Sequence, residues 1–252
     1  MKVKIVGGFG GPAPGKRCTS ILVNDELLLD LGAASVGMSE SEKKKLKHIF
    51  LSHVHLDHIK ELPHLCDDLK RLGRKSVDLH CNQFTESSLR THVFNNILYE
   101  DITDTGTGDL TFHNIASEKE AQVGEYRVVP ISVNHPCDAY GFIIKKGNDM
   151  VVFTMDTGSC FKIWDVVKKQ KENLKGIFFD LSFPNKLHQV ALASGHHTSE
   201  TIAQEIKLMP ANAPLYSIHV KPYYLEEVRG EILKLNNPRI HLVDKDNLVF
   251  NL

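Results

Sequence analysis

Four residues of the kind that bind metal ions lie close together in the segment SHVHLDH. They are His53, His55, Asp57 and His58. A single histidine after a strand is usually structural, but packing alone does not call for three imidazoles and a carboxylate within six positions. Buried without a cation, these groups would lack partners, at a free-energy cost of a few kcal/mol each. A divalent metal ion removes that cost, because imidazole nitrogen and carboxylate oxygen are its natural ligands.

The spacing of these residues indicates two metal ions rather than one. On an extended or tightly turning segment, alternate side chains point the same way. His53 and His55 can therefore bind one ion, while Asp57 and His58 turn toward a second.

The segment resembles the signature of the metallo-β-lactamase superfamily of two-metal hydrolases. The later motifs follow the order of that family, because LLLDLG, VNHP, FTMDTG and YSIHVKP each end an apolar run typical of a strand. These motifs contain Asp30, His135, Asp156 and His219. The resemblance implies an α/β (α+β) fold, a four-layer αββα sandwich, formed by one domain over residues 1–252.

The resemblance also implies a role for each residue. It assigns His53, His55 and His135 to one metal ion, Asp57, His58 and His219 to the other, and Asp156 to both. Asp30 would orient a ligand without binding metal. Zn²⁺ is the first expectation for the two divalent ions, and Mn²⁺ or Fe²⁺ would suit the same mixed nitrogen and oxygen ligands.

Apolar patterns predict the elements that would position these residues. Strands are predicted at 3–7, 19–24, 26–32, 48–52, 126–133, 140–146, 150–155, 176–182, 214–220 and 239–244. Helices are predicted at 40–46, 62–72, 83–98, 160–172, 198–208 and 223–235. Ser39 and Glu42 form a capping-box pattern at the first of these helices. Residues 100–122 lack regular periodicity and are expected to form a surface excursion or lid.

A two-metal centre of this family predicts hydrolysis. Two cations about 3.5–4 Å apart share a bridging hydroxide whose pKa is lowered toward neutrality, so the hydroxide is a nucleophile at physiological pH. Phosphodiester, β-lactam and thioester substrates all suit this chemistry. Other residues must therefore indicate the substrate.

The segment SGHHTSETIAQEIKLM narrows the choice. Phosphodiesterase branches of the superfamily carry a similar G-H-x-[ST] motif, which lactamase and thioesterase branches generally lack. The matching residue is His196, which would donate a proton to the leaving oxygen at a helix start that attracts anions. Asp180 in FFDLSFPN would hold the His196 ring in position, or would alternatively hold a backbone turn. His196, Asp180 and Asp57 are the candidate catalytic residues.

The spread of motifs is most similar to bacterial class II 3',5'-cyclic nucleotide phosphodiesterases, through HLDHIKELP, FNNILYED, VNHPCDAYGFII, FTMDTG, LSFPN and SGHHT. FNNILYED resembles a helical lid of that group, so a lid insertion is expected at about 82–122. Asn95, Asn96, Tyr99 and His197 would then contact the substrate. The alternative for the first three is a place on a helix surface, and for His197 a solvent-facing position at a helix start.

Three other functions stay open. A tRNA 3'-processing endoribonuclease shares most of the motifs but would need a long basic arm, whereas residues 100–122 are acidic and short. A lactamase- or thioesterase-type hydrolase is disfavoured by His196. A non-catalytic protein that kept the metals to sense a nucleotide would carry the same residues.

Composition fits a cytoplasmic protein without membrane or long nucleic acid partners. The 252 residues carry a formal net charge of −1 and five scattered cysteines. The sequence contains no run of eighteen apolar residues. A homodimer is left open.

GGPAPGKR at 10–17 nearly matches a phosphate-binding loop. Arg17 replaces the hydroxyl that would hold Mg²⁺, and the two prolines lack the N–H groups that would bind phosphate. A glycine-rich hairpin near the mouth of the site is therefore expected.

Overall fold

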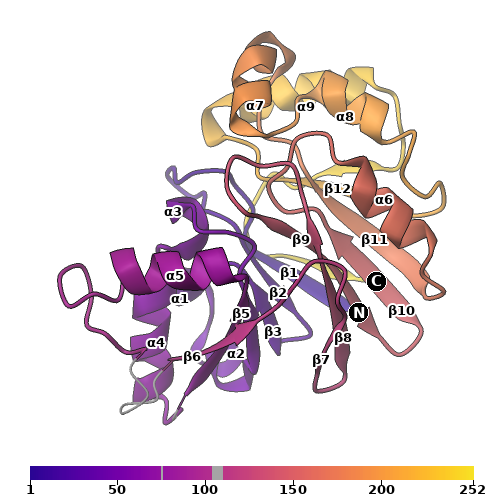
Figure 1. Ribbon diagram of the computed structural model, residues 1–252. Helices are drawn as coiled ribbons and strands as arrows, with labels where there is room; N and C mark the ends of the chain where they lie inside the picture. The colour runs from indigo at the N-terminus through magenta and orange to yellow at the C-terminus, as the bar shows by residue number, and fades with distance from the viewer. Residues whose placement is uncertain (75, 104–109) are drawn as a thin grey trace.

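The structure, a computed structural model, describes residues 1–74, 76–103 and 110–252. Within these residues, two mixed β-sheets of seven strands each pack face to face. Helices cover the outer face of each sheet (Figure 1). This arrangement confirms the predicted four-layer αββα sandwich, in which each layer buries an apolar face against the next.

The first sheet is formed by the N-terminal part of the chain together with the last strand. Its strand order is β14-β1-β2-β3-β4-β5-β6, and β3 to β6 run parallel. The bounds are β1 (Lys2–Gly7), β2 (Ser20–Val23), β3 (Leu27–Leu29), β4 (His48–Phe50), β5 (Val77–Cys81), β6 (Leu110–Asn114) and β14 (Leu248–Asn251).

The second sheet has the order β13-β12-β11-β10-β9-β8-β7, and β10 to β13 run parallel. The bounds are β7 (Ala121–Val123), β8 (Tyr126–Ser132), β9 (Tyr140–Lys146), β10 (Asp149–Phe153), β11 (Asn173–Asp180), β12 (Leu215–Ile218) and β13 (Ile240–Leu242).

The helices divide between the two sheets. Beside the first sheet lie α1 (Ala34–Gly37), α2 (Glu40–Lys45), α3 (Leu56–Ile59), α4 (Leu62–Arg71) and α5 (Gln83–His92). Beside the second lie α6 (Phe161–Lys168), α7 (His188–Ser194), α8 (Ser199–Glu205) and α9 (Leu225–Lys234), with short 3₁₀ turns η1 (Asn185–Leu187) and η2 (Pro222–Tyr224). None of the described helices is both long and apolar enough to cross a membrane.

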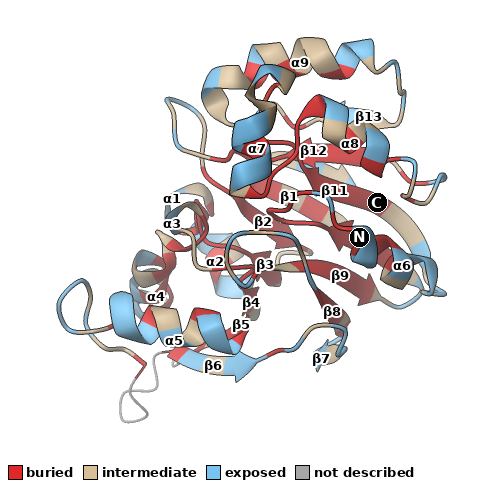
Figure 2. Ribbon diagram, turned by 45° about the horizontal axis from the view of Figure 1, so that its top comes forward, coloured by how far each residue is buried: buried red, intermediate tan, exposed pale blue. Residues whose placement is uncertain are grey.

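Side-chain alternation along the strands produces the layers. In β2, Ile21 and Val23 face the opposite sheet, whereas Leu22 packs against the helices. Between the sheets, the Phe178 ring stacks on Phe153 and Tyr216 at centroid distances of 5.0 and 4.7 Å. Figure 2 shows both sheets largely buried, while the helices expose their outer sides.

One local sequence prediction is confirmed, and two further local features can be described. The Ser39 and Glu42 side chains form the predicted capping box at the start of α2. Pro63 lies in the first turn of α4, where a missing N–H is tolerated. The five cysteines are all free thiols.

The region from 83 to 122 differs from the prediction. Helix α5 ends at His92 rather than near 98, because the Asn95 side chain accepts hydrogen bonds from the Ile97 and Leu98 N–H groups and Asn96 is left-handed with φ 60°. Within 100–122, predicted as irregular, Leu110–Asn114 forms edge strand β6. Residues 104–109 of the predicted lid lie outside the described residues, and the lid stays a prediction.

The candidate site lies at the ends of strands, all of them in the parallel parts of the two sheets except the antiparallel β8. Carboxyl ends of parallel strands meet at one edge of a sheet, and ligands bind there. Asp30 follows β3, the 53–58 segment follows β4, His135 follows β8, Asp156 follows β10, Asp180 ends β11 and His219 follows β12.

We expect Phe178→Ala to lower the free energy of unfolding by about 3–5 kcal/mol, because it leaves a cavity between the sheets. Urea denaturation followed by circular dichroism measures the change. Leu233→Ala, at a side chain that is 73% exposed, should stay within about 0.5 kcal/mol of the wild type. Equal losses in the two variants would contradict this account of the core.

Candidate metal centre

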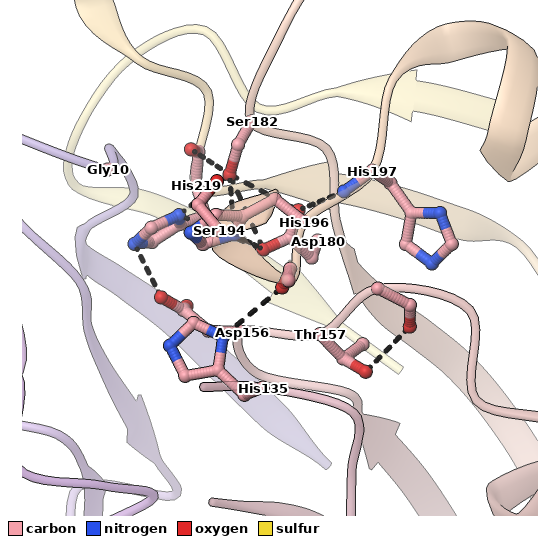
Figure 3. A network of polar contacts seen from close by, with 12 residues as sticks. Gly10, His135, Asp156, Thr157, Asp180, Ser182, Ser194, His196, His197 and His219 are labelled. Atoms are coloured by element: carbon pink, nitrogen blue, oxygen red, sulfur yellow. Dashed lines mark hydrogen bonds and ion pairs between the residues drawn. The ribbon is translucent and has the colours of Figure 1, made fainter. Parts of the chain in front are cut away.

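Ligand candidates from both sheets meet around one carboxylate oxygen. Asp156 Oδ2 lies 3.1 Å from His58 Nε2, 3.2 Å from His219 Nε2 and 3.8 Å from His53 Nε2. Asp57 Oδ2 is 3.4 Å from the same His219 nitrogen. Figure 3 shows the Asp156 carboxylate facing the His219 ring. These residues therefore lie in one cluster, although more than 160 positions separate His53 from His219.

His55 and His135 complete the cluster on the side of His53. His135 Nε2 lies 3.0 Å from His55 Nδ1, and the His53 ring is centred 4.6 Å from His55 and 4.7 Å from His135. His135 Nδ1 donates to the Gly195 carbonyl at 3.1 Å. The structure thus brings together all seven side chains that the sequence analysis assigned to metal binding.

Hydrogen bonds hold the imidazoles by their outward nitrogens. His58 Nδ1 donates to Asp30 Oδ2 at 2.6 Å, and His53 Nδ1 lies 2.8 Å from Ser52 Oγ. His219 Nδ1 lies 2.9 Å from Ser182 Oγ. Because a neutral imidazole has one donor and one acceptor nitrogen, these bonds leave lone pairs on the inward Nε2 atoms.

The inward atoms fit a divalent cation. His58 Nε2 and His219 Nε2 face each other at 3.1 Å, and neither can donate to the other in this tautomer. The buried His53 Nε2 has no hydrogen-bond partner in the described chain. His53, His55 and His135 form one compact donor group, and Asp57, His58 and His219 form another. Converging nitrogen lone pairs and carboxylate oxygens are the donor set of a divalent transition metal.

The electrostatics of the cluster agree with this fit. Burial lowers the pKa of His53 well below its ordinary value. Burial would also raise the pKa of Asp156, but the facing His219 and His58 rings outweigh it and hold that pKa well below the ordinary value. Asp156 and Asp30 in turn outweigh burial and raise the pKa of His58 well above its ordinary value. The buried Asp156 carboxylate therefore stays ionised, and protonated imidazole supplies the opposing charge that a cation would supply in its place.

Unusual backbone at the strand ends aims the side chains inward. Asp30 and His219 adopt left-handed conformations with φ 57° and 69°, which costs about 1–2 kcal/mol for a residue with a Cβ atom. Gly10 lies so close to His219 that a Cβ atom there would meet its carbonyl at 2.5 Å. At Gly32 a Cβ atom would meet the Asp57 carbonyl at 2.0 Å.

His196 lies at the border of the cluster, held by Asp180. Its Nδ1 donates to Asp180 Oδ2 at 2.6 Å, and its ring stacks on His219 at a centroid distance of 5.2 Å. Burial alone would lower the pKa of His196, but the Asp180 carboxylate outweighs burial and raises it. This pairing is the one predicted from the sequence, with the shorter Asp reaching the ring.

His197 differs from its predicted alternative as a solvent-facing residue. Its side chain is 2% exposed, and its Nδ1 lies 3.0 Å from Thr201 Oγ1 in the first turn of α8. The N-cap of α8 is Thr198, so His197 precedes the cap. Its neighbour His196 is therefore the one of the pair whose ring contacts the metal-ligand candidates.

Sequence analysis missed three polar residues beside the cluster. Ser52 Oγ donates to Asp30 Oδ2 at 2.6 Å, and Ser182 Oγ contacts Asp180, His196 and His219. The signal was a serine directly after an apolar strand in FLSH and DLSF. Lys221 Nζ lies 3.7 Å from Asp57 Oδ2 and donates to the Gly10 carbonyl.

The predicted contacts from the lid region have other partners. The Tyr99 hydroxyl donates to Asp67 of α4, and Asn95 donates to the Thr91 carbonyl. Asn96 accepts from the Asp101 N–H. Substrate contact by these residues stays a prediction.

The 10–17 segment forms the expected hairpin. Ala13 and Lys16 exchange backbone hydrogen bonds, and Gly10 packs against His219. The hairpin therefore borders the cluster, as the sequence predicts. Arg17 donates to the Val6 carbonyl and lies 3.6 Å from Asp246.

Two packed mixed sheets with this histidine and aspartate cluster at their common edge define a hydrolase of the metallo-β-lactamase fold. A family model described as the beta-lactamase superfamily domain matches residues 31–220, and the chain belongs to this family.

Individual relatives span more than one activity. The chain is 24% identical over 293 aligned positions to a Yersinia pestis protein named "Probable 3',5'-cyclic-nucleotide phosphodiesterase", covering 92% of this chain and 82% of that protein. It is 26% identical over 153 positions to ribonuclease Z of Pyrococcus horikoshii, covering 55% of this chain and 46% of that relative. The crystal structure of the metallo-β-lactamase fold protein YhfI from Bacillus subtilis matches with a TM-score of 0.77 at 20% identity, over 99% of this chain and 98% of that one.

We expect Asp30→Asn to weaken metal binding roughly 10- to 100-fold, because the amide cannot hold the His58 ring as the carboxylate does. Titration of Zn²⁺ against a competing chromophoric chelator measures the affinity. Asp165→Asn, at an exposed position of α6, is the matched control and should bind Zn²⁺ like the wild type. Unchanged affinity in folded Asp30→Asn would rule out the positioning role.

Proposed function

We propose that this protein is a metal-dependent phosphodiesterase that hydrolyses cyclic nucleotides such as 3',5'-cAMP and cGMP. His53, His55 and His135 would hold one divalent ion, Asp57, His58 and His219 the other, and Asp156 would contact both. When bound, the ions supply Lewis acidity and a water that loses its proton near neutral pH. Asp57, at the open side of the cluster, would accept that proton. Asp30 and Ser52 keep His58 and His53 turned inward.

The His196–Asp180 pair carries the proposal. The Nδ1 atom of His196 is bonded to Asp180, whereas its Nε2 atom has no hydrogen-bond partner among the described residues. A paired carboxylate stabilises the protonated ring, so Nε2 can give a proton to a departing oxygen. A ribose alkoxide is a poor leaving group and needs that proton, as opening of a cyclic phosphodiester requires.

Lys221 supports an anionic substrate. Its ammonium lies 3.7 Å from the Asp57 carboxylate, at the same border of the cluster as His196. A fixed positive charge beside the reacting group stabilises phosphodiester oxygens and the extra charge that develops on them. The reacting carbonyl of a lactam or thioester carries no such charge before attack.

The relatives support a phosphodiester substrate, either a small cyclic nucleotide or a large tRNA. The Yersinia protein, aligned over most of both chains, is named as a cyclic nucleotide enzyme. Ribonuclease Z, aligned over about half of its length, supports a second candidate, tRNA 3'-end cleavage. Both reactions break a P–O bond to ribose and would use the same residues.

A substrate panel tests the proposed function. We expect the metal-loaded protein to hydrolyse a 3',5'-cyclic nucleotide and bis(p-nitrophenyl) phosphate, and to leave a precursor tRNA intact. The wild type should hold about two metal equivalents by atomic emission, whereas Asp156→Ala should lose metal and activity together. Cleavage of the tRNA without opening of cyclic nucleotides would favour the second candidate, and inactivity toward every diester would reject both.

The role of His196 is tested by the leaving group. We expect His196→Ala to retain metal and to lose roughly 10²- to 10⁴-fold in kcat on cyclic nucleotides. The loss should be much smaller on bis(p-nitrophenyl) phosphate, because nitrophenolate leaves without a proton. His197→Ala is the control and should retain turnover, although it loses a buried ring. Equal losses of His196→Ala on both substrates would contradict proton donation.

A further inference from the structure

A cavity of about 480 Å³ opens beside the metal-ligand cluster. His135 and Cys137 belong both to its lining and to the donor group around His53. The volume falls in the range of small-molecule sites. A substrate whose phosphate lies at the cluster would therefore extend into this space.

Two side chains of different chemistry line the cavity. Phe84, in the first turn of α5, is 45% exposed and belongs to the lining of the cavity. Asp138, three positions after His135, is exposed to solvent, and its carboxylate has no hydrogen bond or ion pair with any described residue.

A local brace joins the backbone segments that carry these two residues. Asn82 caps α5 by accepting from the Thr85 N–H, and its amide donates to the Asp138 carbonyl at 3.0 Å. Val133 N–H donates to the Ala139 carbonyl and closes the base of the loop. The helix that carries Phe84 and the loop that carries His135 and Asp138 are thus joined.

We propose, resting on the proposed function, that this cavity is the nucleobase subsite and that it selects guanine. The Phe84 ring offers a face on which a base can stack. A carboxylate such as that of Asp138 accepts hydrogen bonds and donates none. The pairing edge of guanine presents two adjacent donors, N1–H and the exocyclic amine, to such a carboxylate. Adenine and cytosine present one amine beside an acceptor nitrogen, and uracil places its single N–H between two carbonyls.

Equilibrium binding tests the subsite without turnover. We expect the Zn²⁺-loaded full chain to bind GMP roughly tenfold or more tightly than AMP by isothermal titration calorimetry, because a second hydrogen bond to a charged group is lost with adenine. Asp138→Asn should remove most of this difference while binding AMP almost as before. Asp165→Asn is the matched control and should retain the preference. Phe84→Ala should weaken GMP and AMP alike, by roughly fivefold or more.

Kinetics separate this inference from the proposed function. Asp138→Asn should lose roughly tenfold in kcat/KM on cGMP and leave bis(p-nitrophenyl) phosphate hydrolysis unchanged. Equal binding of GMP and AMP by a protein that hydrolyses the aryl diester would overturn the subsite and leave the phosphodiesterase intact. A protein that prefers GMP but cleaves no diester would retain the subsite and lose the proposed enzyme.

Discussion

The convergence of lone pairs at the common edge of the two sheets is the constraint on which the rest of the structure depends. Two imidazole nitrogens face each other at 3.1 Å, and the Asp156 oxygen lies almost equally close to both. Two nitrogen lone pairs and a carboxylate oxygen at these distances repel one another unless positive charge lies among them. The left-handed strand ends and the close approach of Gly10 to His219 are understandable as the means of holding these atoms together.

Two matched braces support the cluster from either sheet. On the first sheet, Asp30 and Ser52 hold the outward nitrogens of His58 and His53. On the second, the Asp180 carboxylate and Ser182 do the same for His196 and His219. Each brace pairs a buried carboxylate with a serine that follows a strand. Under the proposed function the second brace differs, because one of its histidines, His196, would give a proton to the substrate rather than bind metal.

The roles of the histidines and aspartates were predictable from the sequence, because they form recognisable motifs. The roles of residues that depend on their three-dimensional neighbours were not predictable. The types and spacing of His53 to His58 indicate a ligand set, and the strand-end residues were assigned through the resemblance to the family. Strands β5 and β6 were missed because polar residues such as Asp78 and His113 interrupt their apolar pattern. Helix α5 was predicted too long because the Asn95 turn depends on a local hydrogen bond rather than on periodicity. Ser52, Ser182 and Lys221 are common residue types, and only three-dimensional neighbours give them a role.

The origin of the ligands in both sheets has a consequence for the stability of the protein. His53 and His55 follow a strand of the first sheet and His135 a strand of the second, while Asp57 and His58 would share an ion with His219 from the second sheet. An ion held in this way binds only when the two halves are packed, so mass action favours the packed state. At a free metal concentration 100 times the dissociation constant, one such ion would contribute about 2.7 kcal/mol. The amount of folded protein in a cell would then follow the supply of metal as well as the quality of the core.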